Sequence, residues 1–148
     1  MHNLKELCDF YLELPFNKFL DLTVTNISHE KAILCLNSKP DLIGNTFKSI
    51  LHGGVIMSVM DAAGGLLALA HLFNKIKHLP KEQIMKALSE SGTVDIRVDF
   101  LRPGSGMEFN IEADLLRGGK RIAATRIQMS NQNNIIANAS ATYLLGNS

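Results

Sequence analysis

One apolar stretch combines two features that could support chemistry, a glycine-rich start and an isolated acid. His52-Gly53-Gly54 begins the stretch, and Asp61 follows nine residues after the histidine. The first turn of a helix has N–H groups without intrahelical partners and a partial positive charge. Because glycine has no side chain, the N–H groups of Gly53 and Gly54 are open to an oxygen that becomes anionic during acyl transfer. A tight turn that needs glycine backbone angles is the alternative explanation of the pair.

Asp61 is the only acid among residues 55–73. Burying a carboxylate is costly unless it is paired, so this acid requires an explanation. One explanation is structural: a buried hydrogen bond or an arginine partner satisfies the carboxylate. The other is catalytic: the carboxylate activates water or attacks an electrophile itself. Gly64 or Gly65, together with Ala68, lies on the same strip of the expected helix, and these small residues let another backbone or helix approach.

The spacing between the glycines and the acid has a consequence for assembly. Along a helix, Gly54 and Asp61 are about 10 Å apart. A carboxylate that acts on a carbonyl group held at the helix start must come within about 3–4 Å of the reacting atoms. One chain cannot satisfy both conditions for one substrate, but two chains related by a two-fold axis can. The sequence therefore predicts an obligate dimer with shared sites.

The apolar stretch is also nearly long enough to cross a membrane, since residues 55–73 approach spanning length. An acid at the centre of a spanning helix costs roughly 2.5–3.5 kcal/mol, and glycine and alanine residues lower the hydrophobicity of the stretch further. A helix that is apolar on all sides is otherwise a buried one. We therefore expect a core helix over residues 54–73 and no membrane contact.

The remaining elements are expected to surround this helix. An N-terminal helix over residues 3–14, capped by Asn3 and ended by Pro15, precedes strands at 22–27 and 31–37. A short helix with Pro80 at its first position follows and runs to residue 89. Apolar and polar residues then alternate with period two at 94–100 and 107–115, which indicates half-buried strands. Two more strands follow at 121–130 and 135–144, separated by a polar loop at 131–134, and Gly118-Gly119 is expected to form a hairpin turn before them.

These elements predict an α+β fold: a curved antiparallel sheet of five or six strands wrapped around one long central helix. The 148 residues suit a single domain over 1–148, with its core at about 20–145. A net charge of +1 gives no electrostatic reason to expect nucleic acid. Cys8 and Cys35 have no paired spacing and are expected to be buried thiols, and the N-terminal residues lack a secretory pattern, so we expect a cytoplasmic protein. No grouping of His, Cys, Asp and Glu has metal-ligand spacing, and we expect no metal.

Several motifs together resemble one family. HGG with an Asp nine residues after the His is similar to the start of the central helix in PaaI-like acyl-CoA thioesterases of the hotdog fold. GTVDIRVDFLRPG at 92–104 resembles the following strand and turn of that family, and LLRGGKRIAATRIQM and ANASATYL complete the same order. The resemblance extends over residues 20–145, nearly the whole chain.

The resemblance implies roles for individual residues. Asp61 would be the catalytic acid, acting as general base on water or as nucleophile on the thioester carbonyl. The N–H groups of Gly53 and Gly54 would polarise the carbonyl oxygen, and His52 would help to hold the turn. Thr93 matches a hydroxyl residue that orients water beside the acid in some relatives.

The substrate-binding residues follow the family pattern less closely. Many relatives have an Asn six residues before the His, whereas this chain has Thr46 there and Asn45 one residue earlier. Asn45 is therefore the corresponding candidate. Coenzyme A carries several phosphate charges, and Arg102, Arg117 and Lys120 are candidates to bind them by analogy with the family. The alternative is that each is a solvated surface charge.

The expected function is hydrolysis of a medium- to long-chain fatty acyl-CoA to the free acid and coenzyme A, with no cofactor beyond the substrate. The expected assembly is a homodimer, and pairing of two dimers into a tetramer stays open. The main alternative is a non-catalytic hotdog module that binds acyl-CoA or a fatty acid, which would need no acid at Asp61. A dehydratase would use a different acid and His pairing, absent from HGGVIMSVMD, and a purely structural protein would leave Asp61 unexplained.

Overall fold

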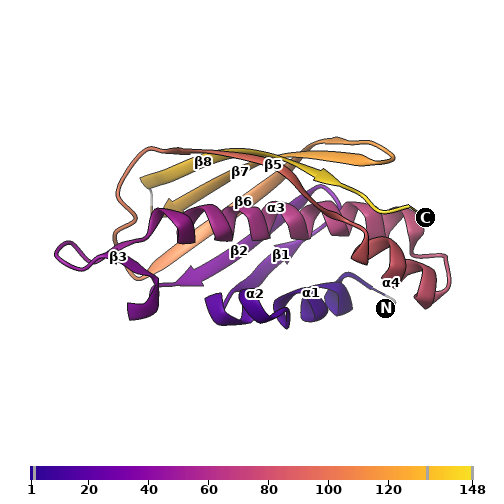
Figure 1. The fold of residues 1–148 in the computed structure, drawn as a ribbon, viewed down its shortest axis with the longest axis horizontal. Helices are drawn as coiled ribbons and strands as arrows, with labels where there is room; N and C mark the ends of the chain where they lie inside the picture. The colour runs from indigo at the N-terminus through magenta and orange to yellow at the C-terminus, as the bar shows by residue number, and fades with distance from the viewer. Residues whose placement is uncertain (2, 133, 148) are drawn as a thin grey trace.

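The computed structural model describes residue 1, residues 3–132 and residues 134–147; Asn133, in the predicted loop before the last strand, lies outside the described residues. Its main layer is a six-stranded sheet with the order β1-β2-β6-β7-β8-β5, in which all neighbouring strands are antiparallel (Figure 1). The strands are β1 Thr23–Ile27, β2 Lys31–Asn37, β5 Gly92–Phe100, β6 Glu108–Gly118, β7 Ile122–Asn131 and β8 Asn134–Leu144. The predicted α+β class and antiparallel sheet are confirmed, and β1 and β5 form its two edges.

The period-two pattern explains how the sheet faces its helix. On β6, Phe109, Ile111 and Ala113 are fully buried, whereas Asn110 and Glu112 between them are only half-buried on the other face. β2 shows the same alternation, with Ala32, Leu34 and Leu36 inside. The buried face of the sheet therefore presents a continuous apolar surface.

The long helix α3, Gly53–Ile76, lies across that surface (Figure 1). Its most apolar 18-residue window has the length and composition of a membrane span, but 61% of that window is buried inside the protein. The helix extends three residues beyond the predicted end at Phe73, because Ile76 still packs into the core. Burial by the surrounding elements accounts for the apolar composition of α3.

Two N-terminal helices replace the single predicted one. α1 spans Leu4–Leu12, and the Asn3 side chain accepts a hydrogen bond from Glu6 N–H at 2.9 Å, as the capping pattern predicted. Pro15 does not merely end this helix; it is the first residue of α2, Pro15–Leu20. Proline at a first helical position loses no hydrogen bond there and has a suitable φ, which is the signal that the sequence prediction missed.

In the C-terminal half, the start of one helix and the position of one hairpin turn differ from the prediction. α4 spans Lys81–Ser89, and Pro80 is its N-cap instead of its first helical residue. The β6–β7 turn is centred on Lys120-Arg121 and closed by a hydrogen bond from Gly119 N–H to Ile122 O at 2.8 Å. Gly118 continues the strand, where a Cβ would lie 2.2 Å from the His71 ring, so close packing is the reason for this glycine.

A short hairpin that the sequence did not predict leads into α3. It consists of a 3₁₀ turn at Pro40–Leu42, β3 Ile43–Asn45 and β4 Ile50–Leu51, and it forms the end of the molecule at which α3 begins (Figure 1). Strands of three and two residues are too short to show a hydrophobic period. His52 N–H donates to Leu42 O at 2.9 Å, which ties the hairpin to the helix start.

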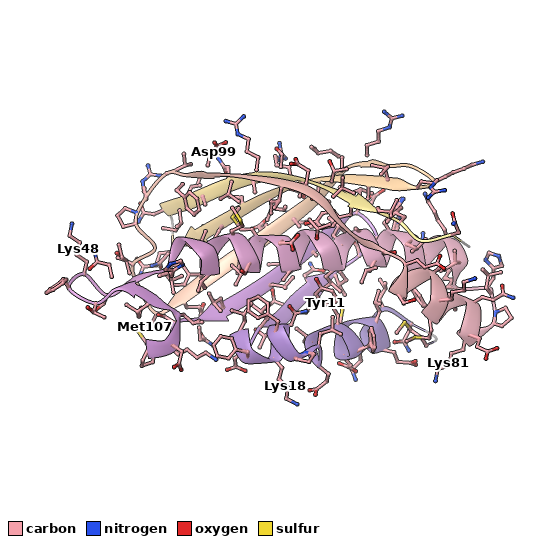
Figure 2. The ribbon with its side chains drawn as sticks, viewed as in Figure 1. Tyr11, Lys18, Lys48, Lys81, Asp99 and Met107 are labelled. Carbon is pink, nitrogen blue, oxygen red and sulfur yellow. The ribbon has the colours of Figure 1, made fainter. Side chains whose placement is uncertain are left out.

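The adjacent glycines of α3 accommodate two tyrosine hydroxyl groups. A Cβ at Gly64 would lie 2.2 Å from Tyr143 Oη, and one at Gly65 would lie 2.9 Å from Tyr11 Oη. Figure 2 labels Tyr11 between α1 and α3, and Tyr143 comes from β8. The close approach expected at these small residues thus comes from side chains, not from another backbone or helix.

Replacing Gly64 by alanine tests this packing. We expect Gly64→Ala to lower the free energy of unfolding by about 1–3 kcal/mol, although alanine is favoured over glycine in a helix by about 1 kcal/mol, because the new Cβ displaces the Tyr143 hydroxyl group. Urea unfolding at one fixed protein concentration measures the change.

Gly92→Ala is the matched control, since no atom of the residues that the structure describes lies within 4 Å of its Cβ position. Tyr143→Phe in the Gly64→Ala background should recover part of the lost stability, because it removes the nearest atom. Equal stability of Gly64→Ala and wild type would contradict this explanation of the glycine.

Candidate active site

Asp61 is the ninth of the 24 residues of α3, and its side chain is half-buried. Thr93, at the start of β5, donates a hydrogen bond from Oγ1 to Asp61 Oδ1 at 2.9 Å. Within the part of the chain that the structure describes, Asp61 forms no ion pair. Of the two structural explanations, the arginine partner is therefore not present among these residues, whereas a hydrogen bond is, from Thr93.

Two tyrosines hold the helix backbone at the acid. Tyr143 Oη donates to Asp61 O at 3.1 Å, and Tyr11 Oη donates to Ala62 O at 3.0 Å. Burial, and secondly the negative charge of Asp61, raise the pKa of both tyrosines far above the ordinary value. Both hydroxyl groups therefore stay protonated and act as donors. The sequence prediction missed these residues; the glycine pair that receives them was the available signal.

The start of α3 is less open than the sequence suggested. His52 is the N-cap, and its Nδ1 accepts a hydrogen bond from Gly54 N–H at 2.9 Å. Val55 and Ile56 N–H both donate to His52 O. Gly53 N–H is the only donor of this first turn without a recorded acceptor among the described residues. The expectation of two free N–H groups is thus corrected to one, at Gly53, because the His52 side chain accepts the hydrogen bond of Gly54 N–H.

A hollow of about 350 Å³ lies at this end of the helix, and we call it the helix-start hollow. Gly53 and Arg102 both line it, with Phe100 and Leu101 from the end of β5 and the loop beyond it. Arg102 Nη1 donates to Ile135 O at 2.8 Å, which fixes the guanidinium group at the rim. The structure therefore brings together two of the predicted site residues, the Gly53 N–H group and a positive charge.

The other predicted substrate-binding residues lie elsewhere. Asn45 belongs to the β3–β4 hairpin, where its Oδ1 accepts a hydrogen bond from Lys48 N–H at 3.2 Å. Arg117 and Lys120 lie at the β6–β7 turn, beside the far end of α3, where Lys75 Nζ donates to Gly119 O. That end is about 30 Å from the helix start along the axis. Within one chain, Arg117 and Lys120 are not brought together with Gly53 or Arg102.

The chemistry of the site is divided between two places on one helix. The carboxylate and its threonine lie about two turns, roughly 10 Å, beyond the N–H group and the arginine. A sheet wrapped around an apolar helix, with an acid on the helix and a glycine-rich start, is the arrangement of a hotdog-fold thioester hydrolase. Comparison with known proteins agrees with this class.

The model of the Thioesterase superfamily matches residues 48–137, so the chain belongs to this superfamily, has the hotdog fold and is a thioester hydrolase. It is 38% identical over 138 residues to the medium/long-chain acyl-CoA thioesterase YigI of Salmonella typhimurium and to YigI of Escherichia coli. These alignments cover 93% of this chain and 89% of each relative. A crystal structure of a Shewanella oneidensis protein related to the thioesterase superfamily superposes with a TM-score of 0.89 and 35% identity, covering 97% of this chain and 95% of that one.

The cap at the start of α3 can be tested by its contribution to stability. His52→Ala removes the acceptor for Gly54 N–H and should lower the free energy of unfolding by about 1 kcal/mol, the usual effect of losing an N-cap side chain. His52→Asn keeps an acceptor at a position where asparagine is a good cap and should stay close to wild type. Thermal unfolding of the three proteins measures the effect, and equal losses in both variants would show that the Nδ1 contact does not stabilise the helix.

Proposed function

We propose that this protein is an acyl-CoA thioesterase that hydrolyses medium- to long-chain fatty acyl-CoA to the free acid and coenzyme A. The observation that carries the proposal is the Asp61 carboxylate, held by Thr93 and unpaired with any cation of the described residues. The similarity to YigI supports acyl-CoA as the substrate class, because that relative is named for medium- and long-chain acyl-CoA. We further propose that the protein is cytoplasmic and requires no cofactor.

Asp61 can act in two ways. As a general base it takes a proton from water while the water oxygen bonds to the carbonyl carbon; the C–S bond then breaks, and the proton passes to the coenzyme A thiolate. As a nucleophile it bonds to the carbonyl carbon itself and expels the thiolate, and water then cleaves the resulting anhydride. Thr93 supports either course as a positioning residue, because its hydroxyl group holds one carboxylate oxygen in place.

The oxyanion of the tetrahedral intermediate needs a donor, and Gly53 N–H at the positive end of α3 is the candidate. In one chain this donor lies too far from Asp61, so the proposal requires the Gly53 of a two-fold-related copy. Arg102 shares the helix-start hollow with that donor and would meet the phosphates of coenzyme A there. Asn45, Arg117 and Lys120 have no such support within one chain.

The edge strand β5 supports a dimer. Among the described strands β5 pairs with β8 alone, so its other side has N–H and C=O groups available to a second strand. Val94, Phe100 and Leu101 are large apolar residues on or beside this edge, and 61%, 51% and 50% of their surfaces are exposed. A second copy packed at β5 would cover these side chains and bring its own helix start toward Asp61. Further pairing of dimers stays open.

Removing the charge of Asp61 tests the catalytic assignment. We expect Asp61→Asn to lower kcat by about 10²–10⁴-fold, the range that general acid–base groups contribute. Thiol release from a series of acyl-CoAs measures turnover. Asp41→Asn, at an exposed position in the 3₁₀ turn, is the matched control and should keep wild-type activity.

The same assay separates hydrolysis from binding alone. Full activity of Asp61→Asn would refute the mechanism, and a wild type that binds acyl-CoA without releasing thiol would indicate the non-catalytic binding module instead.

Mixed dimers test whether the site is shared. Gly53→Pro removes one N–H group at a helical position that proline favours, and the His52 ψ of 137° suits a residue before proline. We expect a loss of about 10²–10³-fold in kcat. Gly53→Ala is the control, because it keeps the N–H group and its Cβ would be in ordinary contact with Phe100 at 3.6 Å.

A purified dimer of one Asp61→Asn chain and one Gly53→Pro chain then contains one doubly impaired site and one intact site if the sites are shared. It should regain about half of the wild-type activity. If each site lay within one chain, every site of the mixed dimer would contain one of the two substitutions, and activity would stay low.

A further inference from the structure

A second hollow, of about 400 Å³, lies on the other side of Asp61 from the helix start. It is formed by α1, α3, α4 and the start of β5, and we call it the α1–α4 pocket. Phe10, Leu14, Leu69, Met85 and Leu88 are among the residues that line it. Its volume falls within the range of about 300–1,000 Å³ that is usual for small-molecule sites. Its lining does not include Asp61, Thr93, Gly53 or Arg102.

The pocket begins beside the acid. Gly65 and Ala68 line it and lie four and seven residues after Asp61, which places them on the same strip of α3. Tyr143, which bonds the backbone of Asp61, and Gly92, the neighbour of Thr93, also line it. From Asp61 to Ala68 the strip is about 10 Å long. A chain attached to a carbonyl group at Asp61 can therefore run along this strip into the pocket.

The lining has little to offer a polar ligand. It contains no Asp, Glu, Lys, Arg or His, and each of its four hydroxyl groups already donates to a backbone carbonyl. Tyr11 and Tyr143 donate to α3, while Ser89 donates to Lys86 O and Ser91 to Ala87 O. A polar occupant would find no charged side chain and no free hydroxyl donor among these residues, so the pocket suits an alkyl chain.

We propose that the α1–α4 pocket binds the alkyl chain of the acyl substrate and that α1 and α4 set the length of chain the enzyme accepts. The inference rests on the proposed acyl-CoA hydrolysis. The acyl group extends from Asp61 toward α4 of its own chain, and coenzyme A extends the other way, toward the helix-start hollow of the partner copy. Ala68, on the wall formed by α3, and Ser89, at the exposed end of α4, are the specificity-determining positions.

Two substitutions that fill the pocket test this assignment. Ala68→Met adds side-chain volume from α3. Ser89→Trp adds volume from the end of α4, and because Ser89 is exposed, the larger side chain there does not disturb the packing of the core. The adjacent Glu90→Trp is the control, because Glu90 is exposed and does not line the pocket. The readout is kcat/KM for saturated acyl-CoAs from butanoyl to hexadecanoyl.

In wild type, kcat/KM should rise about fourfold for each methylene buried until the pocket is full. Ala68→Met and Ser89→Trp should lower kcat/KM more for long acyl-CoAs than for butanoyl-CoA and so shift the optimum to shorter chains, whereas Glu90→Trp should keep the wild-type profile. Unchanged length profiles in both pocket variants would overturn the inference while leaving the hydrolase assignment intact.

A binding measurement distinguishes the two proposals if wild type hydrolyses no acyl-CoA. Calorimetric titration with decanoate then reports on the pocket alone. If decanoate binds both pocket variants more weakly and Glu90→Trp as tightly as wild type, the pocket is supported as the alkyl-chain site, while the absence of hydrolysis rejects the proposed catalysis. Equal binding to all four proteins would overturn the pocket as well.

Discussion

Burial of the apolar helix α3 is the constraint on which the rest of the structure depends, and one carboxylate on that helix conflicts with it. The sheet covers one side of α3 through the inward residues of β2 and β6. α1 and α4 also contact α3. If the cover were complete, Asp61 would be a buried charge without a cation, which is strongly unfavourable. The structure instead leaves the acid half-buried beside Thr93, and this incomplete cover makes the position useful for chemistry.

Side-chain hydrogen bonds also hold the backbone of the helix at the acid. Tyr143 from β8 and Tyr11 from α1 donate to consecutive carbonyl groups, those of Asp61 and Ala62, and Gly64 and Gly65 provide the space for the two rings. Two elements that are distant in the sequence therefore control one turn of the helix. A catalytic side chain must be held closely to its working geometry, and its own packing cannot provide this when it is open to substrate. Contacts to the helix backbone that carries the side chain can hold it in that geometry.

The two hollows on α3 have complementary chemistry. The helix-start hollow has a donor at Gly53 and a positive charge at Arg102, whereas the α1–α4 pocket has neither charge nor free hydroxyl donor. An acyl-CoA has the same division, with an apolar chain at one end of the thioester and an anionic carrier at the other. The two hollows of one chain are separated along the helix, and the proposed two-fold pairing at β5 would place one of each on either side of a single thioester.

The sequence by itself determined the features that repeat along the chain or break a local pattern. The period-two alternation at 94–100 and 107–115 predicted strands, the long apolar run predicted α3, and Asp61 stood out because its neighbours are apolar. Short or non-periodic elements gave no such signal, which is why α2 and the β3–β4 hairpin were missed. The tertiary structure decided how residues far apart along the chain meet: Tyr11 and Tyr143 reach helix carbonyls 51 and 82 residues away. It also decided that the His52 side chain accepts the hydrogen bond of Gly54 N–H. Likewise, Lys120-Arg121 forms the β6–β7 turn, and Gly118 packs against His71. Local patterns report which face of an element is apolar, but only the packed chain fixes which atom fills each space and which donor stays free.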